Sequence, residues 1–191
     1  MKELTEEISD EKIIKLVLKG DTNAFGFLVN RFEKKLGRYI RRFVFSQSDA
    51  EDILQNVFIK AYTNIRGFNF NYKFSSWIYR IAHNEVVNYI RGYKKNIITN
   101  IDWDILFPVD MSKNDMVDEL EKEFLEKWLK ENLKILDKKY KEVLVLYYFE
   151  EMSYKDIADI LKIPVATVGV RLKRAKSVVK NNYDKNIKNK K

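Results

Sequence analysis

Apolar residues recur every three or four positions through most of this chain, which is the spacing of one face of an α-helix. The pattern predicts a first short helix that Ser9 can cap and Gly20 can end. A second helix is predicted after Asp21. Its apolar face is formed by Phe25, Leu28, Phe32, Leu36, Ile40 and Phe43. The N-terminal part of the chain is therefore predicted to be helical.

Two further helices are predicted next, on either side of an aromatic segment. Ser48 and Glu51 have the spacing of a capping box, which places the start of the third helix at Ser48. Gly67 then opens the segment FNFNYKF, whose alternating aromatic residues are compatible with a loop or a strand. A fourth helix is predicted from about Ser75 to Tyr93. Its inner face is formed by Ile78, Ala82, Val86 and Tyr89.

The C-terminal part of the chain has the layout of a helix-turn-helix. Residues 138–149 predict a buried helix, Ser153 predicts the cap of the next one, and residues 162–164 predict a turn. Pro164 suits the first position of the following helix, where its missing N–H has no partner to lose. The buried stripe of that helix is Val168, Leu172, Ala175 and Val179.

Thr167, Arg171 and Arg174 fall on a different, outward stripe of this last helix. The second helix of a helix-turn-helix enters the major groove of DNA. Arginine and threonine can contact base edges or phosphates there. The alternative is an ordinary helical hairpin with a solvated basic face. Gly169 is unfavourable inside a helix, and a close approach to DNA is one possible reason for it.

Charge is distributed unevenly along the chain. Residues 1–95 carry 17 basic and 11 acidic side chains, residues 96–136 carry 5 and 10, and residues 137–191 carry 14 and 7. Two basic ends favour a polyanionic partner, although solvated lysine faces would give the same totals. Residues 96–118 have no sustained period and carry five Asp against one Lys, which predicts a flexible acidic linker. The basic tail, residues 181–191, is predicted to be disordered.

The composition argues against several classes of protein. The chain has no cysteine and a single histidine, His83, so we expect no disulfide, no metal site and no cofactor. No apolar stretch approaches the roughly 18 residues needed to cross a bilayer, and the N-terminus does not have the pattern of a signal peptide. We therefore expect a cytoplasmic protein with no membrane insertion.

Three stretches together resemble a known family. They are DAEDILQNVFIKAY at 49–62, KFSSWIYRIAHNEVVNYIR at 73–91, and LKILDKKYKEVLVLYYFEEMSYKDIADILKIPVATVGVRLKRAK at 133–176. In this order and spacing they are similar to the extracytoplasmic-function (ECF) group of bacterial sigma factors. The resemblance implies an all-α fold of two small helical domains: region two at 1–95 and a helix-turn-helix region four at 119–180. It places the flexible acidic linker between them.

The resemblance also implies a function and partners. A sigma factor binds core RNA polymerase and directs it to promoters; region two reads and melts the −10 element and region four reads the −35 element. The implied contacts are promoter DNA, the clamp of the largest polymerase subunit and the flap of the second-largest. The group often has an anti-sigma factor as well. The linker of the family runs near the active-site and RNA-exit channels, where its charge could mimic RNA or simply be solvated.

Residues of this chain that match the family motifs become candidate contacts. The predicted contacts with core polymerase are Asp49, Glu51, Asp52, Gln55 and Phe58. The predicted contacts with the −10 element are Phe68, as the residue that captures a flipped base, and Arg80, Asn84, Asn88, Arg91, Lys94 and Lys95. The predicted contacts with the −35 element are Ser153, Tyr154, Ala166, Thr167, Val170, Arg171, Lys173 and Arg174.

The family pattern is not matched throughout. Lys162 stands where the family's turn usually has glycine, and residues 166–171 read ATVGVR where the family often has GTVKSR. These departures leave the −35 sequence open. Two other classes are considered: a stand-alone helix-turn-helix regulator, and a nuclease or recombinase. The latter would need the acidic group of Asp49, Glu51 and Asp52 to bind a metal. The regulator leaves the motif at 49–62 unexplained, and the acidic group lies in a capping turn with no His or Cys nearby.

Overall fold

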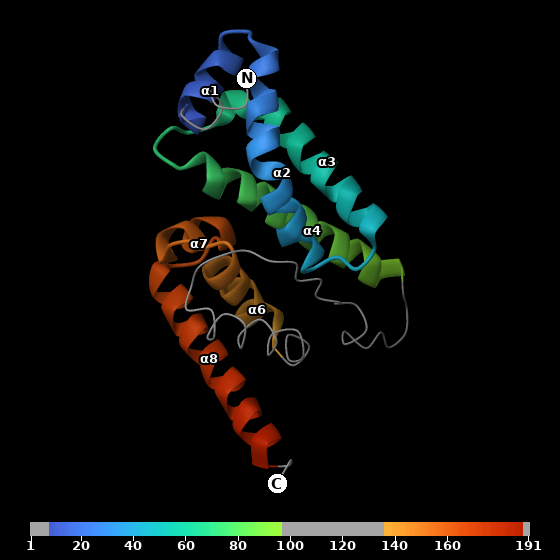
Figure 1. Ribbon diagram of the computed structural model, residues 1–191, viewed down its shortest axis with the longest axis vertical. Helices are drawn as coiled ribbons and strands as arrows, with labels where there is room; N and C mark the ends of the chain where they lie inside the picture. The colour runs from blue at the N-terminus through green and yellow to red at the C-terminus, as the bar shows by residue number, and fades with distance from the viewer. Residues whose placement is uncertain (1–7, 97–135, 189–191) are drawn as a thin grey trace. The chain divides into compact units, whose positions relative to one another are not determined.

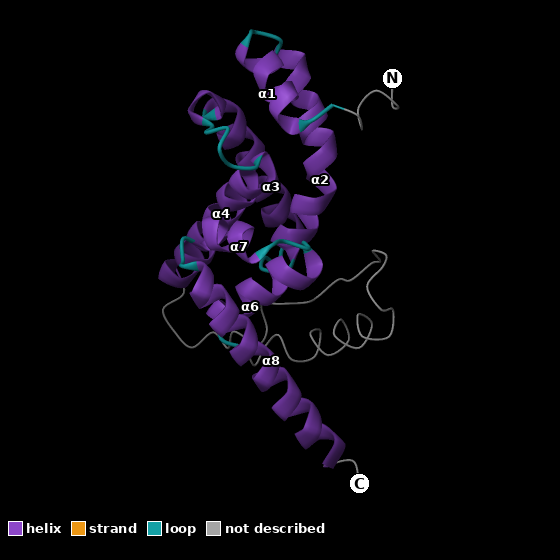
Figure 2. Ribbon diagram, turned by 90° about the vertical axis from the view of Figure 1, so that its left-hand side faces the viewer, coloured by secondary structure: helices purple, strands orange, loops and turns teal. Residues whose placement is uncertain are grey.

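The computed structural model describes residues 8–96 and 136–188, and every regular element in these two ranges is helical (Figures 1 and 2). The predicted all-α class is therefore confirmed. The chain divides into two compact units, one N-terminal and one C-terminal. Two predicted segments lie outside the described residues: the linker from residue 97 to 118, and the start of the region-four domain from 119 to 135.

The N-terminal unit contains the four predicted helices, with two short 3₁₀ turns. Its elements are α1 (Asp10–Leu18), η2 (Thr22–Ala24), α2 (Phe25–Arg41), α3 (Gln47–Thr63), η3 (Ile65–Gly67) and α4 (Phe74–Asn96). Helix α3 packs against both α2 and α4, and α1 packs against α2 (Figure 1). The aromatic segment between η3 and α4 is a loop, so the strand alternative is wrong.

The core of the N-terminal unit is aliphatic and aromatic. Its largest fully buried side chains include Leu28, Leu36, Tyr39, Ile40, Phe74 and Ile78. The rings of Tyr39 and Tyr79 meet edge to face, with centroids 5.4 Å apart. The hydroxyl of Tyr39 lies 3.3 Å from Nδ1 of His83, so the single histidine is a polar contact between α2 and α4. Burying each large apolar side chain contributes about 1.5–3 kcal/mol.

The N-terminal cap of α1 agrees with the sequence prediction, and the cap of α3 differs from it. Ser9 caps α1 as predicted, since its Oγ accepts a hydrogen bond from Lys12 N–H. Helix α3 is capped by Ser46 instead of Ser48, because Ser46 has the extended backbone of a cap and its Oγ accepts from Asp49 N–H at 3.3 Å. The Ser48 Oγ lies 2.9 Å from the Ser46 Oγ, inside the first turn.

The C-terminal unit is built from α6 (Lys138–Leu144), the π-helical turn η4 (Val145–Phe149), α7 (Tyr154–Leu161) and α8 (Val165–Lys188). Helix α6 packs against α8. The predicted stripe of α8 is confirmed as buried, and it meets apolar residues of the other elements. The buried core includes Val143, Leu144, Leu146, Ile157, Val168, Leu172, Ala175 and Val179.

Three details of this unit differ from the sequence prediction. The helix expected over 138–149 changes to π-helix after Leu144. Helix α8 begins at Val165, and Pro164 precedes it with a carbonyl that accepts from Thr167 N–H and Val168 N–H. The tail was predicted to be disordered over residues 181–191; residues 181–188 continue the backbone of α8 as far as Lys188, with no glycine or proline to interrupt it, and residues 189–191 lie outside the described residues.

Candidate nucleic-acid and protein interfaces

Helix α3 presents an exposed stripe opposite its buried face. Asp52 and Gln55, two of the predicted polymerase contacts, are both exposed on it. The stripe continues at Ile59, which is 58% exposed, and at Tyr62, at spacings of four and three. The sequence analysis missed these two. A signal was present, because both are large apolar residues off the buried positions of α3. We refer to Asp52, Gln55, Ile59 and Tyr62 as the α3 stripe.

The other predicted polymerase contacts have different surroundings. Glu51 is exposed, and its Oε1 accepts from Gln47 Nε2 at 2.9 Å. Phe58 is half-buried, as expected of a residue that also serves the core. Asp49 is half-buried, and its Oδ2 accepts from the hydroxyl of Tyr89 at 2.7 Å. Asp49 therefore ties α3 to α4, and its carboxylate is less available to a partner than that of Asp52.

Helix α4 carries the polar face that the sequence predicts. Asn84, Asn88 and Arg91 are exposed at spacings of four and three, and Arg80 lies half-buried one turn earlier. The structure thus brings these four side chains onto one face. Lys94 and Lys95 lie in the last turns of α4, and their side chains are outside the described part of the structure.

The aromatic loop before α4 corrects one prediction. Phe68, predicted to capture a flipped base, is only 6% exposed and packs edge to face against Trp77 at 5.5 Å and Phe74 at 5.8 Å. Its ring is a core group because it fills the space under the loop. The exposed rings are Phe70 and Tyr72, and Lys15 Nζ of α1 lies 5.6 Å from the Phe70 centroid. Phe70 was missed because the loop has no period that separates inward from outward positions, and Lys15 was missed because it lies on α1, far from the loop in sequence.

The turn between α7 and α8 forms as the sequence predicts. Ser153 caps α7: its Oγ accepts from Asp156 N–H at 3.2 Å and donates to Asp156 Oδ2 at 2.6 Å. Lys162 ends α7 with a left-handed backbone of φ 55° and ψ 46°. The N–H of Ile163 then donates to Ala158 C=O at 3.2 Å, which closes the turn. Glycine tolerates this conformation best, so lysine here is strained.

The predicted −35 contacts are distributed between two sides of α8. Ala166, Val170, Lys173 and Arg174 are exposed, and so are Ser153 and Tyr154 at the start of α7. Thr167 and Arg171 are half-buried on the flank. Gly169 lies against α7, since a Cβ built on it would be 3.5 Å from Cε2 of Tyr154, an ordinary contact.

The charge of Arg171 acts on two carboxylates, Asp137 just before α6 and Glu142 within it. Burial raises the pKa of Glu142, and the charges of Lys138 and Arg171 partly oppose this. The pKa of Asp137 is lowered mainly by its hydrogen bond with Lys139, with a smaller contribution from Arg171. Arg171 therefore favours the charged forms of these two carboxylates within the unit.

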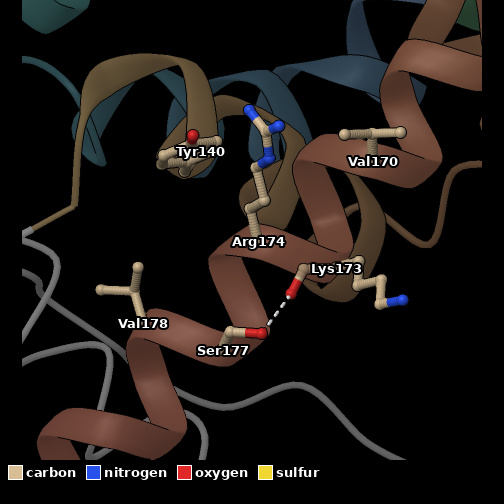
Figure 3. A pocket seen from close by; sticks show the side chains of 6 residues that line it. All are labelled: Tyr140, Val170, Lys173, Arg174, Ser177 and Val178. Atoms are coloured by element: carbon tan, nitrogen blue, oxygen red, sulfur yellow. Dashed lines mark hydrogen bonds between the residues drawn. The ribbon is translucent and has the colours of Figure 1, made fainter.

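An open hollow lies between α6 and α8 beside these residues (Figure 3). Its lining is Tyr140, Val170, Lys173, Arg174, Ser177 and Val178. Arg174 extends toward Tyr140 in Figure 3, and the Ser177 hydroxyl donates to Lys173 C=O at 3.1 Å. Arg174 and the hydroxyl of Tyr140 suit a phosphate group of a nucleic acid backbone, and Lys173, which points away from them in Figure 3, adds positive charge nearby.

Comparison with known proteins decides the family. Residues 28–96 match the Sigma-70 region 2 family, and residues 127–177 match the Sigma-70 region 4 family. The chain is 34% identical over 183 residues to the ECF RNA polymerase sigma factor SigW of Bacillus subtilis, which covers 91% of this chain and 96% of that protein. The chain belongs to the ECF group of the sigma-70 family.

Further relatives of this sigma factor agree with that placement. It is 34% identical over 188 residues to the ECF RNA polymerase sigma-E factor of Haemophilus influenzae, which covers 93% of this chain and 97% of that protein. The solved structure of CnrH, in complex with the cytosolic domain of CnrY, superposes with a TM-score of 0.67 at 23% identity. It covers 92% of this chain and 97% of that one, which supports the fold.

The family matches identify the N-terminal unit as region 2 and the C-terminal unit as region 4. The region 2 match covers most of α2 and all of α3 and α4, and the region 4 match covers α6, α7 and the first half of α8. As a sigma factor, the chain binds core RNA polymerase and directs promoter-specific initiation by reading −10 and −35 elements. Within residues 8–96 and 136–188, no cluster of three His, Cys, Asp or Glu could hold a metal ion. No helix there is long and apolar enough to span a membrane.

Proposed function

We propose that the α3 stripe is the docking surface for core polymerase. Its carboxylate and amide lie beside two exposed apolar side chains, and protein interfaces commonly combine an apolar centre with a polar rim. Glu51 lies next to the stripe and adds negative charge, which favours a basic partner surface. The observation that carries this assignment is the continuous exposure of Asp52, Gln55, Ile59 and Tyr62 along one helix.

Promoter melting is assigned to the exposed side of α4 and the aromatic loop. Asn84 and Asn88 offer amides that can bond base edges, while Arg80 and Arg91 can hold phosphates. Phe70 and Tyr72 replace Phe68 as the rings that stack on an unpaired base, because they are the exposed rings of the loop. Lys15 beside Phe70 supplies a cation for the neighbouring phosphate.

Recognition of the −35 element is assigned to α8 with the start of α7. The exposed residues are Ser153, Tyr154, Ala166, Val170, Lys173 and Arg174. Thr167 lies at the edge of this surface. Arg171 is half-buried and is proposed to contact DNA, while its charge also acts on Glu142 of α6. The flap of the second-largest polymerase subunit is the expected protein contact of the same unit.

The chain acts without catalytic chemistry of its own, in the cytoplasm, as a subunit that supplies specificity to the polymerase. An anti-sigma factor is a further proposed partner. The structure of RpoE with the anti-sigma factor NepR from Bartonella quintana shares the fold, with a TM-score of 0.62 at 19% identity over 82% of this chain and 94% of that one. Both solved relatives are therefore complexes with another protein. The exposed apolar residues of the α3 stripe offer one surface for such an inhibitor.

Reconstitution with core polymerase tests the function. The purified chain is mixed with core RNA polymerase from its host, examined by gel filtration, and used to transcribe fragmented host DNA. Co-elution and discrete start sites with shared upstream motifs are expected. If the chain fails to co-elute but binds duplex DNA alone, with high affinity and strong salt dependence, it acts as a stand-alone regulator instead.

A further inference from the structure

The outward face at the start of α8 is apolar, which is unusual for a helix that reads DNA. Val170 is 50% exposed and Val165 is 48% exposed. Ala166 is exposed one turn before Val170. These side chains lie away from Val168 and Leu172, which are buried in the unit. The surface that faces the major groove in a helix-turn-helix is therefore lined with methyl groups.

Few polar groups on this face are left to read base edges, apart from the hydroxyl of the exposed Tyr154. Gly169 has no side chain, and the Ser153 hydroxyl is bonded to Asp156 within the cap of α7. Arg171 is half-buried, so it is less available to base edges than an exposed arginine, and its charge also acts on the carboxylates of Asp137 and Glu142. Thr167, on the flank, keeps a hydroxyl and a methyl group. Readout through bidentate hydrogen bonds, which identifies guanine or adenine, is thus poorly provided on the first turns of α8.

The cations lie further along the helix. Lys173 and Arg174 begin one turn after Val170 and line the hollow with Tyr140 and Ser177 (Figure 3). Contacts from such groups to phosphates fix the position and register of a protein on the duplex without reading sequence. The exposed methyl groups of Ala166 and Val170 therefore lie at the start of α8, and Val170 borders the hollow that holds the phosphate-binding groups.

Thymine is the base that matches an apolar reader, because its C5 methyl group projects into the major groove. We infer that α8 selects the −35 element through the methyl groups of thymines, with Val170 as the principal contact and Ala166 beside it. This inference rests on the proposed role of α8 in −35 recognition. It names the class of base that this helix favours and explains why residues 166–171 lack the polar side chains often found there.

Replacing thymine by deoxyuridine tests the inference, because it removes only the methyl group and keeps base pairing. Holoenzyme is reconstituted from the full chain and core polymerase, and a promoter is selected from a library randomised over the −35 element. Each thymine of the selected element, on either strand, is then replaced singly by deoxyuridine, and holoenzyme affinity is measured. At least one replacement is expected to weaken binding about fourfold, the loss for one methyl-sized group.

A variant assigns the effect to a residue. Val170→Ala removes two methyl groups from an exposed helix position, where alanine is a better helix former. It is expected to weaken binding to the thymine duplex and to abolish the difference between thymine and deoxyuridine at one position. Val178→Ala removes the same atoms about two turns further along α8, where Val178 lines the hollow. It can change the overall affinity through the hollow, but it is expected to leave the difference between thymine and deoxyuridine unchanged.

The possible results separate the inference from the proposed function. If no deoxyuridine replacement changes affinity while the holoenzyme still selects a −35 element and initiates there, the inference is overturned and the function stands. A methyl effect that persists undiminished in Val170→Ala overturns the assignment to Val170. If no element is selected and no initiation occurs, the proposed function fails together with the inference.

Discussion

The hydroxyl of Tyr89 donates a 2.7 Å hydrogen bond to Oδ2 of Asp49, which joins the middle of α4 to the first turn of α3. The same two helices are joined again by Lys60 and Glu85, whose Nζ and Oε1 lie 2.6 Å apart. Helix α3 carries the proposed polymerase contacts and α4 carries the proposed −10 contacts. These two bonds therefore fix the register between the two interfaces of region two.

Tyr89→Phe is expected to lower the free energy of unfolding by about 1–2 kcal/mol, because a half-buried carboxylate loses a hydrogen bond. Urea denaturation followed by circular dichroism measures the change. Tyr72→Phe is the control, since that hydroxyl belongs to an exposed side chain of the loop. Equal stability of the two variants would contradict a role for the Tyr89–Asp49 bond.

Lys162→Gly is expected to stabilise the C-terminal unit by about 1 kcal/mol. Lys162 has a φ of 55° at the end of α7, where a side chain costs energy and glycine does not. Hydrogen exchange of the α7 amides, and urea denaturation of the chain, measure the gain. Lys155→Gly is the matched control: the same change inside α7 should cost about 1 kcal/mol. A Lys162→Gly variant no more stable than the parent would show that the turn is unstrained.

The buried faces of the helices could be predicted from the sequence. The stripe of Val168, Leu172, Ala175 and Val179 follows directly from the helical period, since only one face of α8 can be covered. The cap of α3 was not predictable in the same way. Ser46 and Ser48 both offer a hydroxyl close to the helix start, and the backbone conformation selects between them.

For the candidate sites too, the residues on a regular helix were predictable and the residues placed by three-dimensional packing were not. The exposed face of α4 with Asn84 and Asn88 follows from the helical period, so the sequence places it correctly. The loop around Phe68 and Phe70 has no period, so only three-dimensional packing decides which ring is buried. The charge of Arg171 acts on Glu142, which is 29 residues earlier in the chain and on another helix. A local pattern does not contain that interaction.

The pH dependence of stability is expected to depend on Lys141. Burial lowers the pKa of this lysine to about 7, while the lysine of the unfolded chain keeps its ordinary pKa of 10.5. Between these values the unfolded state binds more protons, so stability rises with pH. An increase of about 2 kcal/mol between pH 7 and pH 9 is expected in urea denaturation. The buried Glu142, whose pKa is raised from 4.5, acts in the opposite direction on the acid side.

Lys141→Met tests the source of this slope. It keeps the length of the side chain and removes the titrating group, so the rise between pH 7 and pH 9 should become much smaller. Lys155→Met, at an exposed position of α7, should leave the rise unchanged. An equal slope in the parent and in Lys141→Met would assign the pH dependence to another group.

Phe70→Ala is expected to weaken binding of holoenzyme to the single-stranded −10 sequence by about tenfold, the loss of one stacked base. Fluorescence anisotropy of a labelled oligonucleotide measures the affinity. Phe70→Trp is the control, because it keeps an exposed ring and should retain most of the binding. Phe68→Ala should instead lower the free energy of unfolding by about 3–5 kcal/mol, since that ring is buried. Loss of binding in Phe68→Ala at unchanged stability would restore Phe68 as the stacking residue.

Ile59→Ala is expected to weaken association with core polymerase by about tenfold. A large side chain at the centre of a docking surface loses its contacts, and truncating such a residue commonly costs more than about 1 kcal/mol. Phe45→Ala is a closely matched control, because Phe45 is 57% exposed against 58% for Ile59, and it lies between α2 and α3, outside the α3 stripe. Competition between labelled parent and unlabelled variants for core polymerase measures both. If the two variants compete equally well, exposure alone does not mark the docking surface and the α3 stripe is not its centre.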